Sequence, residues 1–216
     1  MIQRSELLSS EIRELKQLLE GLPQTSVIQR ISLESRLKSV LHAFEQEATI
    51  PKPSRARLTF RGRPVVGSRG IAADFGGKAS NAFADAFSAV VAGLNESLQL
   101  MGPIPDRAKS QLLITGTAIG SFGFELELPV AGLFPDEEKA DEALQKMQSL
   151  FEASAMGSDD DVAELVDAIH PRAVKKISEF LGILLQYQAW CGLEFKNKIF
   201  RFENIDQLIK SADRLE

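Results

Sequence analysis

The chain has few of the residues that build metal centres, disulfides and membrane spans. Its 216 residues include one cysteine, Cys191, and two histidines, too few for a disulfide within the chain or for a structural zinc site. No window approaches the roughly 18 apolar residues of a membrane helix, and the charged N-terminus lacks the apolar core of a secretory signal. We therefore expect a soluble protein of the reducing cytoplasm that uses no metal or cofactor and does not bind membranes.

Acidic residues are missing from one long segment. No Asp or Glu lies between Glu47 and Asp74, whereas six positive charges fall between Lys52 and Arg69. The whole chain has 25 basic and 30 acidic residues, so an acidic protein carries one basic stretch. Clustered arginines neutralise phosphates, which makes this stretch a candidate for binding anions or nucleic acid. The candidate residues are Arg55, Arg57, Arg61, Arg63 and Arg69.

Residues 1–50 predict an antiparallel helical hairpin. Apolar residues recur at helical spacing on both sides of a break at 21–23. Two helices alone bury too little apolar surface to be stable, so their stripes need the body of the chain, another copy or a different protein to pack on. We assign 1–50 to docking or oligomerisation. The predicted interaction surface is Leu8, Ile12, Leu15, Leu19, Leu37, Leu41 and Phe44.

A proline-containing linker over 49–54 separates this hairpin from a body that we place at 51–216. Residues 56–61 alternate between apolar and polar side chains, which predicts a strand with Leu58 and Phe60 inside and Arg57 and Arg61 outside. A turn at 62–64 predicts a return strand at 65–66.

The rest of the body predicts helices and two further hairpins. Asp74 is expected to cap a long apolar helix, and alternation over 122–128 predicts the second strand of another hairpin. If that strand lies beside 57–61, Glu125 and Glu127 become the counter-charges of Arg57 and Arg61. Three helices, a hairpin around Lys196 and a last helix capped by Asn204 complete the chain. The predicted fold class is α+β, an antiparallel sheet of hairpins covered on one face by helices.

No complete catalytic or metal-binding motif is present. Lys78 follows two glycines but lacks the other residues of a phosphate-binding loop, and Asp159–Asp161 is not followed by the glycine and glutamate of a calcium loop. Ser121 and Cys191 form no recognisable catalytic triad with a histidine. We therefore expect no catalytic residue.

Two segments resemble parts of known bacterial proteins. LTFRGRPVVGSRGI and LLITGTAIGSFGFELE, within 58–128, are similar to bacterial proteins of unassigned activity with a glycine-ended strand, an apolar helix and a Gly-Ser-Phe hairpin. Some of these proteins lie near mobile or defence-related genes. The resemblance implies a bacterial intracellular setting and a role as an accessory component of a defence-type system, and it implies no site residue.

Three hypotheses follow from the sequence. The first is a non-enzymatic protein that forms homo-oligomers or binds a protein partner through its N-terminal helices. The alternative is an anion-binding or nucleic-acid-binding module that uses the basic stretch at 55–69. The third is a divergent metal-dependent nuclease built on Glu194, Lys196 and Asp167, because a Glu-x-Lys pair on a strand occurs in such enzymes.

Overall fold

The computed structural model describes residues 4–23, 25–49, 53–105, 107, 110–118, 122–127 and 137–216. They belong to two compact units, Met1–Lys52 and Pro53–Glu216. Residues 50–52 of the expected linker, Ser121 and Leu128 lie outside the described residues.

The described residues form helices and strands in the order that the sequence predicts for an α+β protein. The helices are α1 (Arg4–Gly21), α2 (Val27–Thr49), α3 (Ala73–Leu94), α4 (Glu137–Met156), α5 (Asp159–Asp167), α6 (Pro171–Gln186) and α7 (Ile205–Arg214). The strands are β1 (Arg55–Gly62), β2 (Val65–Val66), β3 (Gly70–Ile71), β4 (Leu113–Thr117), β5 (Gly123–Glu127), β6 (Ala189–Phe195) and β7 (Lys198–Arg201).

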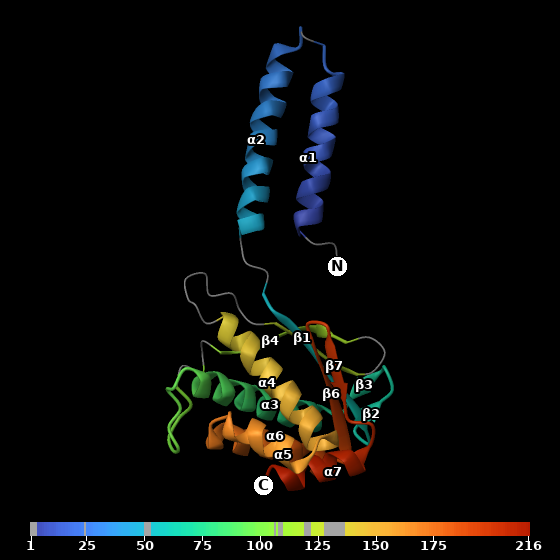
Figure 1. Ribbon diagram of the computed structural model, residues 1–216. Helices are drawn as coiled ribbons and strands as arrows, with labels where there is room; N and C mark the ends of the chain where they lie inside the picture. The colour runs from blue at the N-terminus through green and yellow to red at the C-terminus, as the bar shows by residue number, and fades with distance from the viewer. Residues whose placement is uncertain are drawn as a thin grey trace. The chain divides into compact units, whose positions relative to one another are not determined.

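The N-terminal unit is a hairpin in which α1 and α2 pack together as antiparallel helices (Figure 1). The guanidinium of Arg36 lies 2.7 Å from the carboxylate of Glu11 and joins the two helices. At the turn, Arg30 donates a hydrogen bond of 3.1 Å to the carbonyl of Leu22. Among the described side chains of this unit, Leu15 alone is fully buried, with 5% of its surface exposed.

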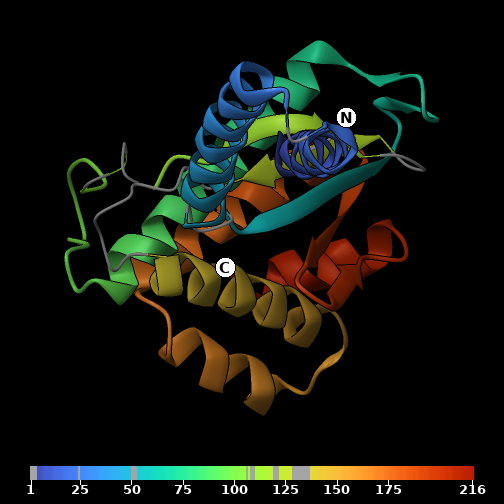
Figure 2. The same ribbon diagram turned by 90° about the horizontal axis from the view of Figure 1, so that it is seen from above.

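The second unit is built on a five-stranded antiparallel sheet in the order β4-β5-β1-β6-β7. β1 is the central strand and pairs with β5 on one side and with β6 on the other (Figure 2). This confirms the predicted antiparallel sheet and the α+β class. β2 and β3 form a separate two-stranded sheet.

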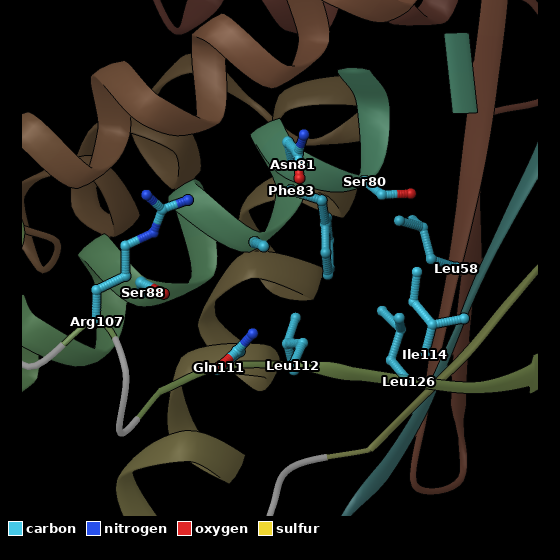
Figure 3. A pocket seen from close by; sticks show the side chains of 11 residues that line it. Leu58, Ser80, Asn81, Phe83, Ser88, Arg107, Gln111, Leu112, Ile114 and Leu126 are labelled. Atoms are coloured by element: carbon cyan, nitrogen blue, oxygen red, sulfur yellow. The ribbon is translucent and has the colours of Figure 1, made fainter. Parts of the chain in front are cut away.

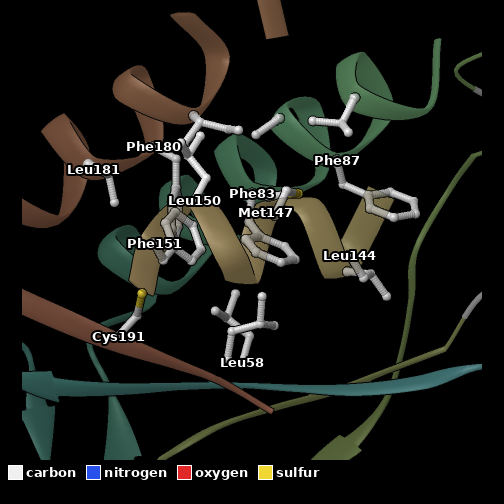
Figure 4. Close-up of a cluster of buried hydrophobic side chains, with 14 of the residues drawn as sticks. Leu58, Phe83, Phe87, Leu144, Met147, Leu150, Phe151, Phe180, Leu181 and Cys191 are labelled. Carbon is white, nitrogen blue, oxygen red and sulfur yellow. The ribbon is translucent and has the colours of Figure 1, made fainter. Parts of the chain in front are cut away.

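Alternation along β1 gives the sheet two different faces. Leu58 and Phe60 are fully buried, whereas Arg57 and Arg61 are exposed. The buried face lies under α3, α4 and α6, and Figure 4 shows Leu58 of β1 beneath α4. We call the opposite face, which carries Arg57 and Arg61, the outer face.

Aromatic rings connect the sheet to the helices and the helices to each other. The ring of Phe60 meets that of Phe75 on α3 edge to face at 5.3 Å. Phe180 on α6 lies 5.4 Å from Phe83 on α3 and 6.1 Å from Phe151 on α4, measured between ring centroids. Such pairs add about 0.5–1.5 kcal/mol each to the free energy of burial, so Phe180 holds the three helices together.

Two local expectations are wrong. Val65 and Val66 pair with β3 and not with β1, because β1 already has a partner strand on each side. The α3 helix begins after Ala72 without a side-chain cap, and Asp74 lies inside its first turn. The cap at Asn204 is confirmed, since its side-chain oxygen accepts a hydrogen bond of 3.0 Å from the backbone of Gln207.

Two glycines at the end of β1 and in the turn after it have a positive φ, and one of them also lies against the backbone of another segment. Gly62 has a φ of +107°, and a Cβ atom there would lie 2.3 Å from the carbonyl oxygen of Gln188. Gly67 also has a positive φ, +53°, but a Cβ atom there would meet nothing within 4 Å.

We therefore expect Gly67→Ala to lower the free energy of unfolding by about 1–2 kcal/mol, the cost of the left-handed backbone alone. Gly62→Ala adds a backbone clash and should cost about 3 kcal/mol or more. Urea denaturation of both variants measures the difference. Equal destabilisation would contradict the close approach of β1 and β6 at this turn.

Candidate functional site

Glutamates on both neighbouring strands neutralise the first two arginines of β1. Arg57 lies opposite Glu125 of β5 and Glu194 of β6, at N–O distances of 3.2 and 3.6 Å. Arg55 pairs with Glu127 at 3.2 Å. The expectation that Glu125 faces Arg57 is confirmed, whereas Glu127 faces Arg55 and not Arg61. These exposed pairs contribute about 0–1 kcal/mol each, but they remove two cations from the set available to a ligand.

The remaining candidate arginines have no such partners among the described residues. Arg61, Arg63 and Arg69 are exposed, and none forms an ion pair within the part of the chain that the structure describes. Arg61 is four residues beyond Arg57 on the same strand, about 13 Å away, which exceeds the Debye length of about 8 Å at physiological salt. The glutamates that hold Arg57 therefore do little to neutralise Arg61.

Two further residues of the outer face were missed in the sequence. Trp190 of β6 lies directly opposite Arg61, and Arg201 of β7 lies opposite Gly192 of β6. Directly opposite residues of an antiparallel pair share a face, so an aromatic ring and another exposed arginine join Arg61. The indole nitrogen of Trp190 is buried without a hydrogen-bond partner among the described residues, so packing alone holds this side chain.

The predicted interaction residues of the hairpin mostly lie between its own helices. Leu15 is fully buried, and the six others are only half-buried, namely Leu8, Ile12, Leu19, Leu37, Leu41 and Phe44. The stripes of α1 and α2 therefore face each other, but each helix covers the other incompletely.

The closed end of the hairpin exposes a second apolar surface. Leu18, Val27, Ile28 and Ile31 are exposed there, Ile28 with 84% of its surface. Beside them is a hollow of about 670 Å³ between the end of α1 and the start of α2. Its lining carries no charge and consists of Gln17, Leu18, Gly21, Leu22, Ile28, Gln29, Ser32 and Leu33. We call Leu18, Val27, Ile28, Ile31 and this hollow the hairpin tip.

The body contains an apolar cavity of about 400 Å³ between α3 and the sheet. In Figure 3, Ser80, Asn81 and Phe83 of α3 line one wall and Ile114 and Leu126 the other. Of the described lining residues Arg107 alone is ionisable, and its guanidinium is paired with Asp85. A cavity with one ionisable residue, already paired, does not provide an acid and a base for catalysis.

A polar cluster lies on the surface at the start of α3. The ammonium of Lys78 donates hydrogen bonds to the hydroxyl of Tyr187 at 2.8 Å and to Asp74 at 3.2 Å, and the Tyr187 hydroxyl donates to Asp74. The bond from Tyr187, followed by that from Lys78, holds the pKa of Asp74 below its usual value. The bond to Tyr187, followed by that to Asp74, raises the pKa of Lys78. The cluster is exposed and joins α3 to the end of α6.

Glu194 and Lys196 of the nuclease hypothesis form ion pairs with different partners. Glu194 faces Arg57, whereas the ammonium of Lys196 lies 2.7 Å from Asp141 of α4. Asp167 is the last residue of α5. Within the described residues no group of three or more His, Cys, Asp or Glu side chains is placed to hold a metal ion. The hypothesis gains no support from this arrangement.

Two other sequence expectations concern the burial of Cys191 and the absence of membrane helices. Cys191 is buried in the core, and burial raises the pKa of its thiol. None of the described helices has the length and apolar character to cross a bilayer.

In comparisons with known proteins, no protein-family model, curated protein or solved structure matches the chain.

The cluster at Asp74 makes a prediction about pH. Because the pKa of Asp74 is lowered by folding, its stabilising contribution is present above the usual pKa of an aspartate and is lost as the pH falls through the folded value. The contribution of Lys78, whose pKa is raised, is lost instead as the pH rises through its folded value.

We expect Tyr187→Phe to raise the pKa of Asp74 and to lower that of Lys78, because the hydroxyl is the largest cause of both shifts. NMR titration of the carboxyl and ammonium resonances measures both. Asp161 is an internal control, because hydrogen bonds from Ser158 lower its pKa and the substitution leaves them intact. An Asp74 titration unchanged in the variant would contradict the assigned cause.

Proposed function

We propose that the protein acts by self-association, with the helical hairpins of two copies packing into a four-helix bundle. The observation that supports this proposal is the incomplete burial of the hairpin. Among its described side chains Leu15 alone is fully buried, while the rest of the stripe is half-buried and the hairpin tip is exposed. Helices in proteins are stabilised mainly by packing of their apolar face, and this hairpin lacks most of that packing.

The charge of the hairpin favours a second copy as its partner. Residues 1–52 contain seven basic and seven acidic residues, so the whole net charge of −5 belongs to the remainder of the chain. Two hairpins without net charge do not repel each other. A partner recognised by its own charge would find no excess of opposite charge on the hairpin. The lining of the tip hollow is likewise uncharged.

The hairpin tip also has the shape that a twofold contact requires. In such a contact the same surface serves both copies, so each must offer both a protruding group and a hollow. Ile28 protrudes beside the hollow that it helps to line, and its side chain is 84% exposed. We infer that Ile28 of each copy enters the hollow of the other, as knobs enter holes in helical bundles.

Self-association makes the protein a scaffold that brings two α+β bodies together. The first hypothesis from the sequence allowed either a homo-oligomer or a different protein partner, and the present proposal selects a homodimer. No chemical reaction is required of the body for this role.

The test uses Ile28→Glu with Ile31→Glu, which places four carboxylates in the contact of a dimer. We expect the wild-type chain to have twice its mass of 23.7 kDa by light scattering and the variant to be a monomer. Leu100→Glu with Met101→Glu is the matched control, because these residues of the body are also exposed, at 73% and 85%. The control should remain a dimer.

Circular dichroism of the same samples separates assembly from folding. If the hairpin depends on its partner, the variant loses helix in proportion to dissociation. A wild-type chain that is monomeric over a wide range of concentration, or a variant that remains dimeric, would overturn the proposal.

A further inference from the structure

The outer face of the sheet has two ends that differ in charge. At one end Arg55 and Arg57 are held by three glutamates of the neighbouring strands. Toward the other end Arg61, and Arg201 in the register row of Thr59, are exposed and form no ion pair with any described residue. Arg63 and Arg69, also exposed and unpaired among the described residues, follow β1 at this end. The acidic net charge of the protein therefore coexists with a local excess of positive charge.

Between Arg57 and Arg61, the middle row of the outer face holds small residues on three neighbouring strands. Thr59 of β1 is flanked in register by Gly123 of β5 and Gly192 of β6, and we call these three residues the glycine row. A Cβ atom at Gly123 would lie 2.3 Å from the carbonyl oxygen of Leu58, so the close pairing of β5 with β1 requires glycine at this point. Both glycines are buried, whereas Thr59 is half-buried.

The glycine row also determines where Arg201 lies. A Cβ atom at Gly192 would be 2.5 Å from Cγ of Arg201 and 3.0 Å from the hydroxyl of Thr59. The stem of Arg201 therefore lies across Gly192 toward the centre of the sheet. Arg201 therefore adds a second exposed arginine to the outer face, in the register row next to that of Arg61 and Trp190.

Trp190 adds the aromatic surface that the basic stretch lacks in sequence. It lies opposite Arg61 on the outer face and is only partly buried. An aromatic ring beside unpaired arginines is the combination that proteins use to bind single strands, because bases stack on the ring while cations hold the phosphates.

We propose that this part of the outer face, made of Arg61, Trp190 and Arg201, binds single-stranded nucleic acid without sequence preference. The two guanidiniums hold phosphates of the strand and one base stacks on Trp190. Exposed arginines outside any described cavity suit a strand held at several points, whereas a free nucleotide is usually bound in a pocket that buries most of its surface. This proposal is independent of the self-association of the hairpin.

Trp190 reports directly on this site because it is the one tryptophan of the chain. Titration of the full-length protein with a short oligothymidine should quench its fluorescence, since the base stacks on the ring. The affinity should fall steeply between about 50 and 200 mM salt, as phosphate contacts release counterions.

Arg61→Ala with Arg201→Ala tests the phosphate contacts. For a single strand, every phosphate that is no longer neutralised by an arginine makes the slope of log affinity against log salt shallower by about 0.7, so the double variant should have a slope shallower by about 1.4. The matched control is Lys175→Ala with Lys210→Ala, which removes two exposed cations from α6 and α7 and should leave the slope unchanged.

Trp190→Leu tests the stacking contact. The anisotropy of a labelled oligothymidine measures the affinity of this variant, which has no tryptophan. We expect the affinity to fall about fivefold or more with the salt slope preserved. Because Trp190 is partly buried, thermal unfolding of this variant is measured alongside, and the arginine variants test the proposal if it does not fold.

Three results would overturn the proposal. The first is no quenching by oligothymidine at low salt. The second is a slope that becomes equally shallow in the lysine control. The third is quenching by adenosine monophosphate that is as strong as that by the oligonucleotide and competes with it, which would identify a free nucleotide as the ligand instead.

Discussion

Hydrogen bonding of β1 on both sides is the constraint on which the rest of the body depends. β1 pairs with β5 over Arg55–Thr59 and with β6 over Ala56–Gly62, although β6 is more than a hundred residues away in the chain. A central strand has one face for the core and one for solvent, and alternation along β1 sends Leu58 and Phe60 to the helices. Because side chains alternate, this pairing also fixes which charges meet on the outer face.

The registers of β1 with its two neighbours divide that face into an end where the arginines are paired with glutamates and a basic end. Glu125 and Glu194 converge on Arg57, whereas the residues opposite Thr59 and Arg61 are two glycines and Trp190. A shift of one residue in either register would turn the glutamates toward the core and expose apolar side chains. The charge pattern of the outer face is thus a consequence of core packing.

Local sequence patterns predicted much of this fold, while contacts between distant segments were harder to predict. Alternation at Leu58 and Phe60 identified the core face of β1, and the Asn204 cap located the start of α7, because both depend on neighbours in the chain. The pairing of β2 with β3 was missed, because a turn at Gly62 does not reveal that β6 already occupies that edge of β1. Trp190 and Arg201 were not recognised as companions of Arg61 for the same reason, since only the registers of β6 and β7 bring them together.

Native-state hydrogen exchange tests the central position of β1 most directly. If β1 is the innermost strand, the amide of Phe60, which donates to the carbonyl of Phe122 at 2.8 Å, should exchange only through global unfolding, with an opening free energy equal to the stability from denaturation. Interior amides of the edge strand β4 should open at lower free energy. Exchange of β1 amides as fast as those of β4 would contradict the sheet order, which determines the residues on the buried face and on the outer face of the sheet.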